Sequence, residues 1–187
     1  MRALLAAAVV MAATPAVAQT VAERMQVCLA CHGEKGQSTH PEVPSLGAQQ
    51  KDYVLTQLYM FREKLRNVAL MNEMAKGLSD DDLRAIAESI AKLPPPPPAA
   101  GGDDAARIAR AKALVDGNRC NSCHASNFAG QDQVPRLAGQ REDYLVKALR
   151  EYKSGARPGY DPAMASVVAP LQDRDFVDLA YYLARSP

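Results

Sequence analysis

Two short segments of the chain each place two cysteines and a histidine within five consecutive residues. They are Cys28-Leu29-Ala30-Cys31-His32 and Cys120-Asn121-Ser122-Cys123-His124. Cysteines three positions apart on one turn of helix point the same way, so they can form two thioethers with the vinyl groups on one edge of a porphyrin. The adjacent histidine then comes under the iron as an axial ligand. Cys-x-x-Cys-His is the attachment pattern of a c-type haem.

A bare Cys-x-x-Cys pair has two other interpretations, a thioredoxin-like dithiol and a zinc knuckle. The histidine after each pair, the repetition and a secretory start of the chain favour haem. All four cysteines lie in the two motifs, which leaves none for a disulfide. We therefore expect two covalently bound haem c groups. The attachment residues would be Cys28, Cys31, Cys120 and Cys123, and the iron ligands His32 and His124.

What fills the other axial position of each iron decides between electron transfer and ligand chemistry. From residue 105 onward the chain has one methionine, Met164, and no histidine other than His124. Methionine is the expected sixth ligand of an electron-transferring haem c, so elimination predicts Met164.

The first half offers several candidates for the same position. Met71 lies seven residues before Leu78, which opens a Leu-x-Asp-x-Asp segment, and Met164 lies seven before Leu171, which opens the matching segment. This alignment of the repeats favours Met71 as the iron ligand. Met74 remains the alternative, whereas Met60 in an amphipathic stretch is expected in the core. His40 is expected in a solvated loop.

The chain begins with the pattern of a secretory signal. Arg2 is followed by an uncharged apolar stretch, residues 3–13, and by the cleavage pattern Ala16-Val17-Ala18. The stretch is shorter than the ~20 residues that a bilayer requires. We expect residues 1–18 to be a cleaved signal peptide, and the mature protein to be soluble and exported, with at most peripheral membrane association.

The remainder reads as an internal duplication of helical units, residues 19–93 and 105–187, with a linker at 94–104. Residues 44–49 correspond to 135–140, and Tyr53 corresponds to Tyr144. Each unit continues with an amphipathic helix, a basic loop that contains Arg66 or Arg157, and a final helix with an acidic start. A helix is expected over residues 105–118, but only a stub over 21–27.

The linker opens with five prolines, Pro94 to Pro98, which cannot continue a helix and favour a stiff polyproline spacer. A flexible glycine pair follows them. The run weakens the expectation of a close, fixed interface between the halves.

Charge excludes one class of partner. The 22 basic and 21 acidic side chains leave no basic footprint for nucleic acid. Residues 136–157 are locally basic and would steer an acidic partner, although a solvated helix face with interleaved acids is the preferred interpretation.

Several positions outside the haem motifs also follow a known family pattern. They are Gly33, Val43 to Leu46, Gln49, Tyr53, Met71 and Leu78 to Asp80 in the first half, and Pro135 to Gln140, Tyr144, Met164 and Leu179 to Tyr182 in the second. With them the chain resembles the class I cytochromes c, and within these the tandem dihaem "c-four" cytochromes of bacterial periplasms.

The resemblance implies an all-α fold of two tandem class I cytochrome c domains joined by a Pro-rich linker, with the first and last helices of each domain crossing. It implies that the Pro44 and Pro135 carbonyls accept hydrogen bonds from His32 and His124, which would fix the orientation and basicity of the imidazoles. Ser89 stands where the second half has Tyr182, so a looser first domain is expected.

The family role implies a periplasmic electron carrier, not an enzyme, that links a cytochrome bc complex to a haem–copper terminal oxidase. The alternative is a cytochrome c subunit of a periplasmic dehydrogenase. A haem enzyme or gas sensor is less favoured, because it needs an open or releasable iron position.

Overall fold

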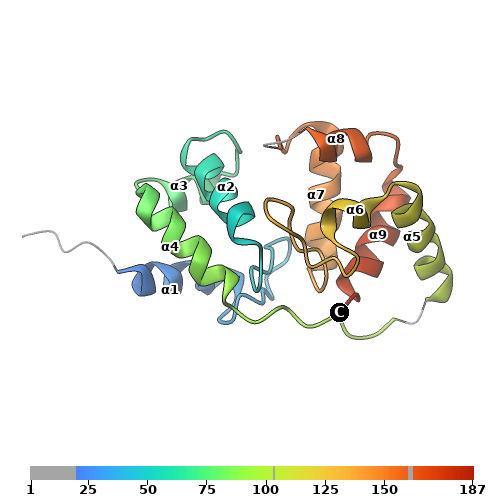
Figure 1. Cartoon of the computed structure of the whole chain (residues 1–187), viewed down its shortest axis with the longest axis horizontal. Helices are drawn as coiled ribbons and strands as arrows, with labels where there is room; N and C mark the ends of the chain where they lie inside the picture. The colour runs from blue at the N-terminus through green and yellow to red at the C-terminus, as the bar shows by residue number, and fades with distance from the viewer. Residues whose placement is uncertain (1–19, 103, 160–161) are drawn as a thin grey trace, which may run out of the picture.

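The computed structural model describes residues 20–102, 104–159 and 162–187, and their regular elements are helices arranged in two adjacent domains (Figure 1). The predicted signal peptide, residues 1–18, lies outside the described residues. The first domain contains α1 (Val21–His32), α2 (Lys51–Arg62), α3 (Ala69–Ala75) and α4 (Asp80–Ala91). The second contains α5 (Ala105–Gly117), α6 (Cys120–His124), α7 (Glu142–Ser154), α8 (Ala163–Val168) and α9 (Asp173–Ala184). The all-α prediction is confirmed.

Each domain packs its last helix against two of its other helices, α1 and α2 in the first domain and α5 and α7 in the second. In the first domain Leu83, Ile86 and Ile90 of α4 are buried against α2. In the second, Phe176 and Leu179 of α9 are buried between α5 and α7. None of the helices in the described ranges is long and apolar enough to cross a membrane.

Side chains at the helix starts explain where the last helix of each domain begins. Ser79 accepts a hydrogen bond from the Asp82 N–H, and the Asp82 carboxylate accepts one from the Ser79 N–H. At α9 the Asp175 carboxylate likewise accepts from the Gln172 N–H at 2.8 Å, and the Asp175 N–H donates to the Gln172 backbone carbonyl at 2.9 Å. Each pair satisfies two N–H groups that the first helical turn leaves free. The acidic starts predicted for these two helices are therefore present.

The haem motifs lie on differently built helices. In the first domain α1 runs from Val21 through both cysteines to His32, so the predicted stub is five residues too short. It ends at Gly33, where φ is +87° and a side chain would clash with the Gln37 carbonyl. In the second domain the helix breaks after Gly117, because Arg119 takes a left-handed φ of +53°. The motif then forms the separate short helix α6.

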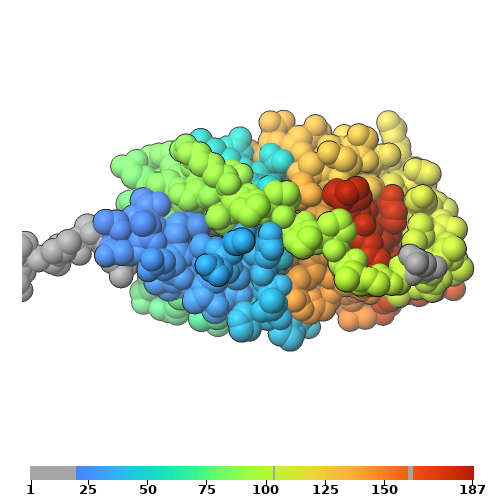
Figure 2. All heavy atoms as spheres, turned by 90° about the horizontal axis from the view of Figure 1, so that it is seen from below, coloured from blue at the N-terminus to red at the C-terminus, as the bar shows by residue number. Residues whose placement is uncertain are grey.

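The proline linker is extended, as predicted, but it does not hold the domains apart. It runs along one side of both domains (Figures 1 and 2). On the side of the first domain, the Gln37 side chain donates a hydrogen bond to the carbonyl of the linker residue Pro95, at 3.2 Å. The Ala99 N–H donates to the Ala184 carbonyl in the second, at 2.8 Å. Gly139, with a φ of +68°, passes so close to the Pro96 carbonyl that a side chain there would clash.

The two domains meet directly through a hydrogen-bonded interface. It is formed by the loops that follow the haem motifs and by α2 and α7. Hydrogen bonds cross it between the pairs Ser38–Arg141, Glu42–Asp143, Glu42–Lys147, Ser45–Gln140, Gln49–Arg136, Gln50–Ala129 and Tyr53–Arg157. A close interface, which the polyproline run had made doubtful, is therefore present.

Candidate haem sites

The first candidate site lies at the C-terminal end of α1. Cys28 is half-buried, Cys31 is exposed, and His32 is only 7% exposed. The His32 Nδ1 atom lies 2.8 Å from the carbonyl oxygen of Pro44, in the loop after α1. The motif therefore presents one exposed and one half-buried thiol beside a buried imidazole that is hydrogen-bonded to a backbone carbonyl.

The second site repeats this arrangement on α6. Cys120 is half-buried, Cys123 is exposed, and His124 is 4% exposed. Its Nδ1 atom lies 2.9 Å from the Pro135 carbonyl oxygen. The contact that the family resemblance implies is thus present in both domains, although the helices before the motifs differ.

The environment of the two histidines favours a neutral imidazole. Burial lowers the pKa of His32 and of His124, and the hydrogen bond to the proline carbonyl opposes that shift in part. A neutral imidazole that donates from Nδ1 keeps its free lone pair on Nε2. Each histidine therefore offers Nε2 as a metal ligand.

A structural zinc site needs four closely placed ligands, whereas each motif supplies two cysteines and one histidine. Burial raises the pKa of the Cys28 and Cys120 thiols. No group of three or more His, Cys, Asp or Glu side chains within the described ranges is placed to hold a metal ion.

The methionines occupy distinct environments. Met71 on α3 and Met164 on α8 are both half-buried, and each packs against the core of its own domain. Met74 is 40% exposed, and Met60 on α2 is buried. His40 lies exposed in a loop. Met71 and Met164 therefore match in element, burial and repeat position, whereas Met74 has no matching methionine.

Two buried arginines test whether the chain suits haem, whose propionates are anionic. Arg157 is 4% exposed, and its two Nη atoms donate to the Tyr144 and Tyr53 hydroxyls at 2.9 and 2.8 Å. Arg66 is buried as well and donates to Gln57 at 2.7 Å.

Neither arginine has a carboxylate counter-charge among the residues that the structure describes. The Nε atoms of Arg66 and Arg157 are buried without a hydrogen-bond partner, and neither guanidinium has a carboxylate partner within the described ranges. Burial opposes the charge of Arg157, but the Tyr144 and Tyr53 oxygens raise its pKa well above the ordinary value. A buried charge requires a nearby opposite charge, so the site fits an anionic group such as a propionate.

Sequence patterns identified each arginine only as part of a basic loop, and the interface residues Gln49 and Gln140 only as markers of the family. A signal for both sets was present. Arg66 and Arg157 are separated by the same number of residues as Gln49 and Gln140 and as Tyr53 and Tyr144. Polar residues repeated in register outside the haem motif point to a shared structural task.

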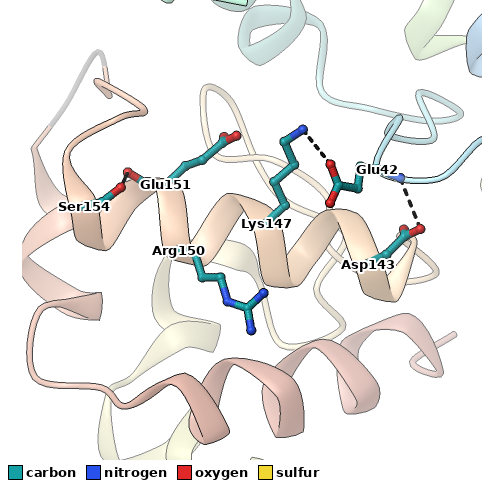
Figure 3. A pocket seen from close by; sticks show the side chains of 6 residues that line it. All are labelled: Glu42, Asp143, Lys147, Arg150, Glu151 and Ser154. Carbon is teal, nitrogen blue, oxygen red and sulfur yellow. Dashed lines mark hydrogen bonds and ion pairs between the residues drawn. The ribbon is translucent and has the colours of Figure 1, made fainter.

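The basic stretch 136–157 is largely engaged within the molecule. Lys147 pairs with Glu42 of the first domain at 2.9 Å, and Arg150 pairs with Asp173 at 2.6 Å. Figure 3 shows the Glu42 side chain paired with Lys147, and the Glu42 N–H donating to the Asp143 carboxylate. These residues line a hollow of about 340 Å³ beside α7. These contacts favour the interpretation as a paired helix face over that as a free basic patch.

Comparisons with known proteins agree with this geometry. The sequence profile of the Cytochrome c family matches residues 18–94 and 108–186. Cytochrome c4 of Pseudomonas aeruginosa is 31% identical over 168 residues, with 84% of this chain and 82% of that protein covered. The thiosulfate dehydrogenase electron acceptor of Thiomonas intermedia is 32% identical over 171 residues, with 86% and 78% covered.

A solved structure gives the same result. Reduced recombinant cytochrome c4 from Pseudomonas stutzeri superposes with a TM-score of 0.79 at 29% identity. The match covers 91% of this chain and the whole of that one.

Proposed function

Because the chain belongs to the cytochrome c family, as a tandem dihaem class I cytochrome c with two covalently bound haem c groups, we propose that it works as a periplasmic electron carrier between a cytochrome bc complex and a haem–copper terminal oxidase. The observation that carries the proposal is the pair of buried histidines, each held from Nδ1 by a proline carbonyl and each accompanied in its domain by a half-buried methionine.

Each half of the chain supplies a complete set of haem-binding residues in this proposal. In the first domain Cys28 and Cys31 hold the haem, and His32 and Met71 ligate the iron. In the second domain Cys120 and Cys123 hold the haem, and His124 and Met164 ligate the iron. Arg66 and Arg157 compensate the charge of propionates.

The haem supplies an iron that exchanges one electron between its ferric and ferrous states. The same histidine and methionine would ligate each iron in both states, so that little structural reorganisation would accompany electron transfer. Methionine ligation raises the reduction potential relative to ligation by two histidines. The Pro44 and Pro135 carbonyls fix the imidazole orientation. No side chain needs to act as an acid or base.

The oxidase role is tested by stopped-flow oxidation of the purified, reduced protein with washed membranes of its host, with and without an oxidase inhibitor. We expect fast, inhibitor-sensitive oxidation of both haems. Negligible oxidation by membranes that oxidise another cytochrome c would contradict the role.

A second candidate function is that of an electron-accepting subunit of a periplasmic dehydrogenase. It is favoured by the similarity to a thiosulfate dehydrogenase electron acceptor across most of the chain. A partner enzyme that co-purifies with the native protein, and that reduces it on addition of substrate, would support this function. A protein that purifies alone and is oxidised by membranes would support the free carrier.

Export is part of the proposal, with the chain processed after Ala18. The intact mass of the periplasmic protein should equal that of residues 19–187 plus two haems. A mass that includes the first 18 residues would contradict cleavage.

A further inference from the structure

Two buried glutamines cross the domain interface in a symmetrical way. The Gln140 Oε1 atom accepts a hydrogen bond from the Ser45 N–H, and its Nε2 atom donates to the Ser45 carbonyl, both at 2.8 Å. Gln49 makes the same two contacts to Arg136, at 2.6 Å from the N–H and 3.2 Å to the carbonyl. Each glutamine thus holds one backbone residue of the other domain at two points.

The backbone N–H groups that the glutamines hold belong to particular peptide groups. The Ser45 N–H is part of the same peptide group as the Pro44 carbonyl, which accepts from His32. The Arg136 N–H is part of the same peptide group as the Pro135 carbonyl, which accepts from His124. A single peptide group therefore joins each imidazole to a glutamine of the other domain.

A peptide group transmits polarisation between its two ends, because resonance couples the nitrogen to the carbonyl. Donation from the N–H makes the carbonyl oxygen a stronger acceptor, as in other hydrogen-bonded chains. A stronger acceptor draws the Nδ1 proton of the imidazole and makes Nε2 a better electron donor. A better donor stabilises ferric over ferrous iron and so lowers the reduction potential.

Two further contacts fix the orientation of the amides. The Gln140 Oε1 atom also accepts from the Arg141 N–H at 3.0 Å, and the Gln49 Oε1 atom accepts from the Gln50 N–H at 3.1 Å. Each Oε1 atom thus faces two N–H groups, whereas the Nε2 atom faces a carbonyl. The acceptor end of each amide is therefore directed at the peptide group that carries the proline carbonyl.

We propose that Gln140 is a positioning residue that lowers the reduction potential of the haem in the first domain, and that Gln49 does so for the haem in the second. Each domain then tunes the haem of the other through the interface. The inference rests on the histidine ligation proposed above.

The test uses Gln140→Leu and Gln49→Leu in the full-length holoprotein, with Gln50→Leu as the matched control. Gln50 also donates across the interface, to the Ala129 carbonyl at 2.8 Å, but its side chain does not contact the peptide groups that face the histidines. The measurements are spectroelectrochemical potentials and the proton chemical shifts of the His32 and His124 Nδ1–H groups in the reduced protein.

We expect a crossed pattern. Gln140→Leu should raise the potential of the first haem and move the His32 Nδ1–H signal upfield, and Gln49→Leu should do the same for the second haem and His124. Gln50→Leu should change neither. Gln140→Glu keeps the acceptor and should move the His32 signal in the opposite direction, which provides a test if the leucine variants fold poorly.

Unchanged potentials and proton shifts in the leucine variants would overturn the inference. So would equal shifts of both haems, or a control that shifts as much, because these would reflect a loosened interface. Failure of the ligand assignment is separable, since the wild-type protein would then lack the methionine–iron absorption of a His–Met haem.

Discussion

The two domains carry the same haem motif but differ in how their first and last helices are joined. In the second domain Arg107 and Arg110 donate to the Asp178 carboxylate at 3.1 and 2.7 Å. In the first domain the corresponding helices share one ion pair, Arg24 to Asp82, at 3.4 Å, and the Arg24 Nε atom has no hydrogen-bond partner.

Aromatic packing and exposure differ in the same direction. Phe128 and Tyr182 make an edge-to-face contact with their ring centres 5.9 Å apart. The equivalent positions of the first domain hold Gly36 and Ser89. The large apolar side chains that are exposed within the described ranges all belong to the first domain and are Val27, Tyr59, Leu65, Val68, Leu70 and Met74.

The same haem motif therefore lies in two domains whose first and last helices are joined by different numbers of side-chain contacts. The second domain holds its crossing helices with polar and aromatic contacts of its own. The first domain has fewer such contacts, so we expect it to depend more on its haem and on the interface. The next four predictions test this contrast, in order of decreasing effect.

The largest effect is expected from loss of a proposed sixth ligand. Met164→Ala and Met71→Ala should each leave both haems attached but make one of them five-coordinate and able to bind carbon monoxide when reduced. The measurement is the absorption of the reduced protein before and after carbon monoxide. Met74→Ala is the control and should bind none. Carbon monoxide binding in that variant, with none in Met71→Ala, would reverse the assignment in the first domain.

A smaller effect separates the two helix crossings. Asp178→Asn weakens hydrogen bonds to two charged groups and should lower the free energy of unfolding of the second domain by about 2 kcal/mol. Arg24→Gln removes a longer, partly exposed ion pair and should cost about 0.5 kcal/mol. Hydrogen exchange in each domain measures both values. Equal costs would show that the crossings are equally supported.

The same carboxylate predicts a response to acid. The hydrogen bond from Arg110 is the main cause that lowers the pKa of Asp178, with a further contribution from Arg107. A lowered pKa in the folded state gives stability that is full above the unfolded value of ~3.9 and is lost as pH falls through the folded value. Unfolding titrations below pH ~4 should therefore narrow the gap between wild type and Asp178→Asn. A gap that stays constant on acidification would contradict this.

The smallest effect concerns the aromatic pair. A double-mutant cycle of Phe128→Leu and Tyr182→Leu should give a coupling free energy of about 1 kcal/mol, the range found for edge-to-face pairs. The first domain has no equivalent aromatic pair, because Gly36 and Ser89 occupy the corresponding positions. No measurable coupling would mean that the rings contribute only buried area.

The sequence was sufficient for features that depend on local spacing. Cys28 to His32 and Cys120 to His124 mark the haem sites because thioether formation fixes their spacing, and Ser79 marks the start of α4 because capping is local. The helix expected over residues 105–118 agrees with α5 to within one residue. The continuous helix α1 was not predicted, because the expected stub 21–27 stops before the haem motif through which α1 continues.

The domain interface also could not be predicted from local sequence patterns. The contact between Gln140 and Ser45 joins residues 95 positions apart, and no periodic pattern encodes such a pairing. The five prolines correctly predicted an extended linker, but they did not indicate that the linker would pack along both domains. The repetition of Gln49 as Gln140 was the sequence feature that indicated a shared structural role for these two positions.

The central claim is that both haems have closed, His–Met-ligated irons suited to electron transfer. The most direct measurement is a redox titration of the wild-type protein followed by addition of carbon monoxide to the fully reduced form. We predict uptake of two electrons, a methionine–iron absorption from both haems when oxidised, and no carbon monoxide binding. Carbon monoxide binding by the reduced wild-type protein would show an open iron position and contradict the assignment as an electron carrier.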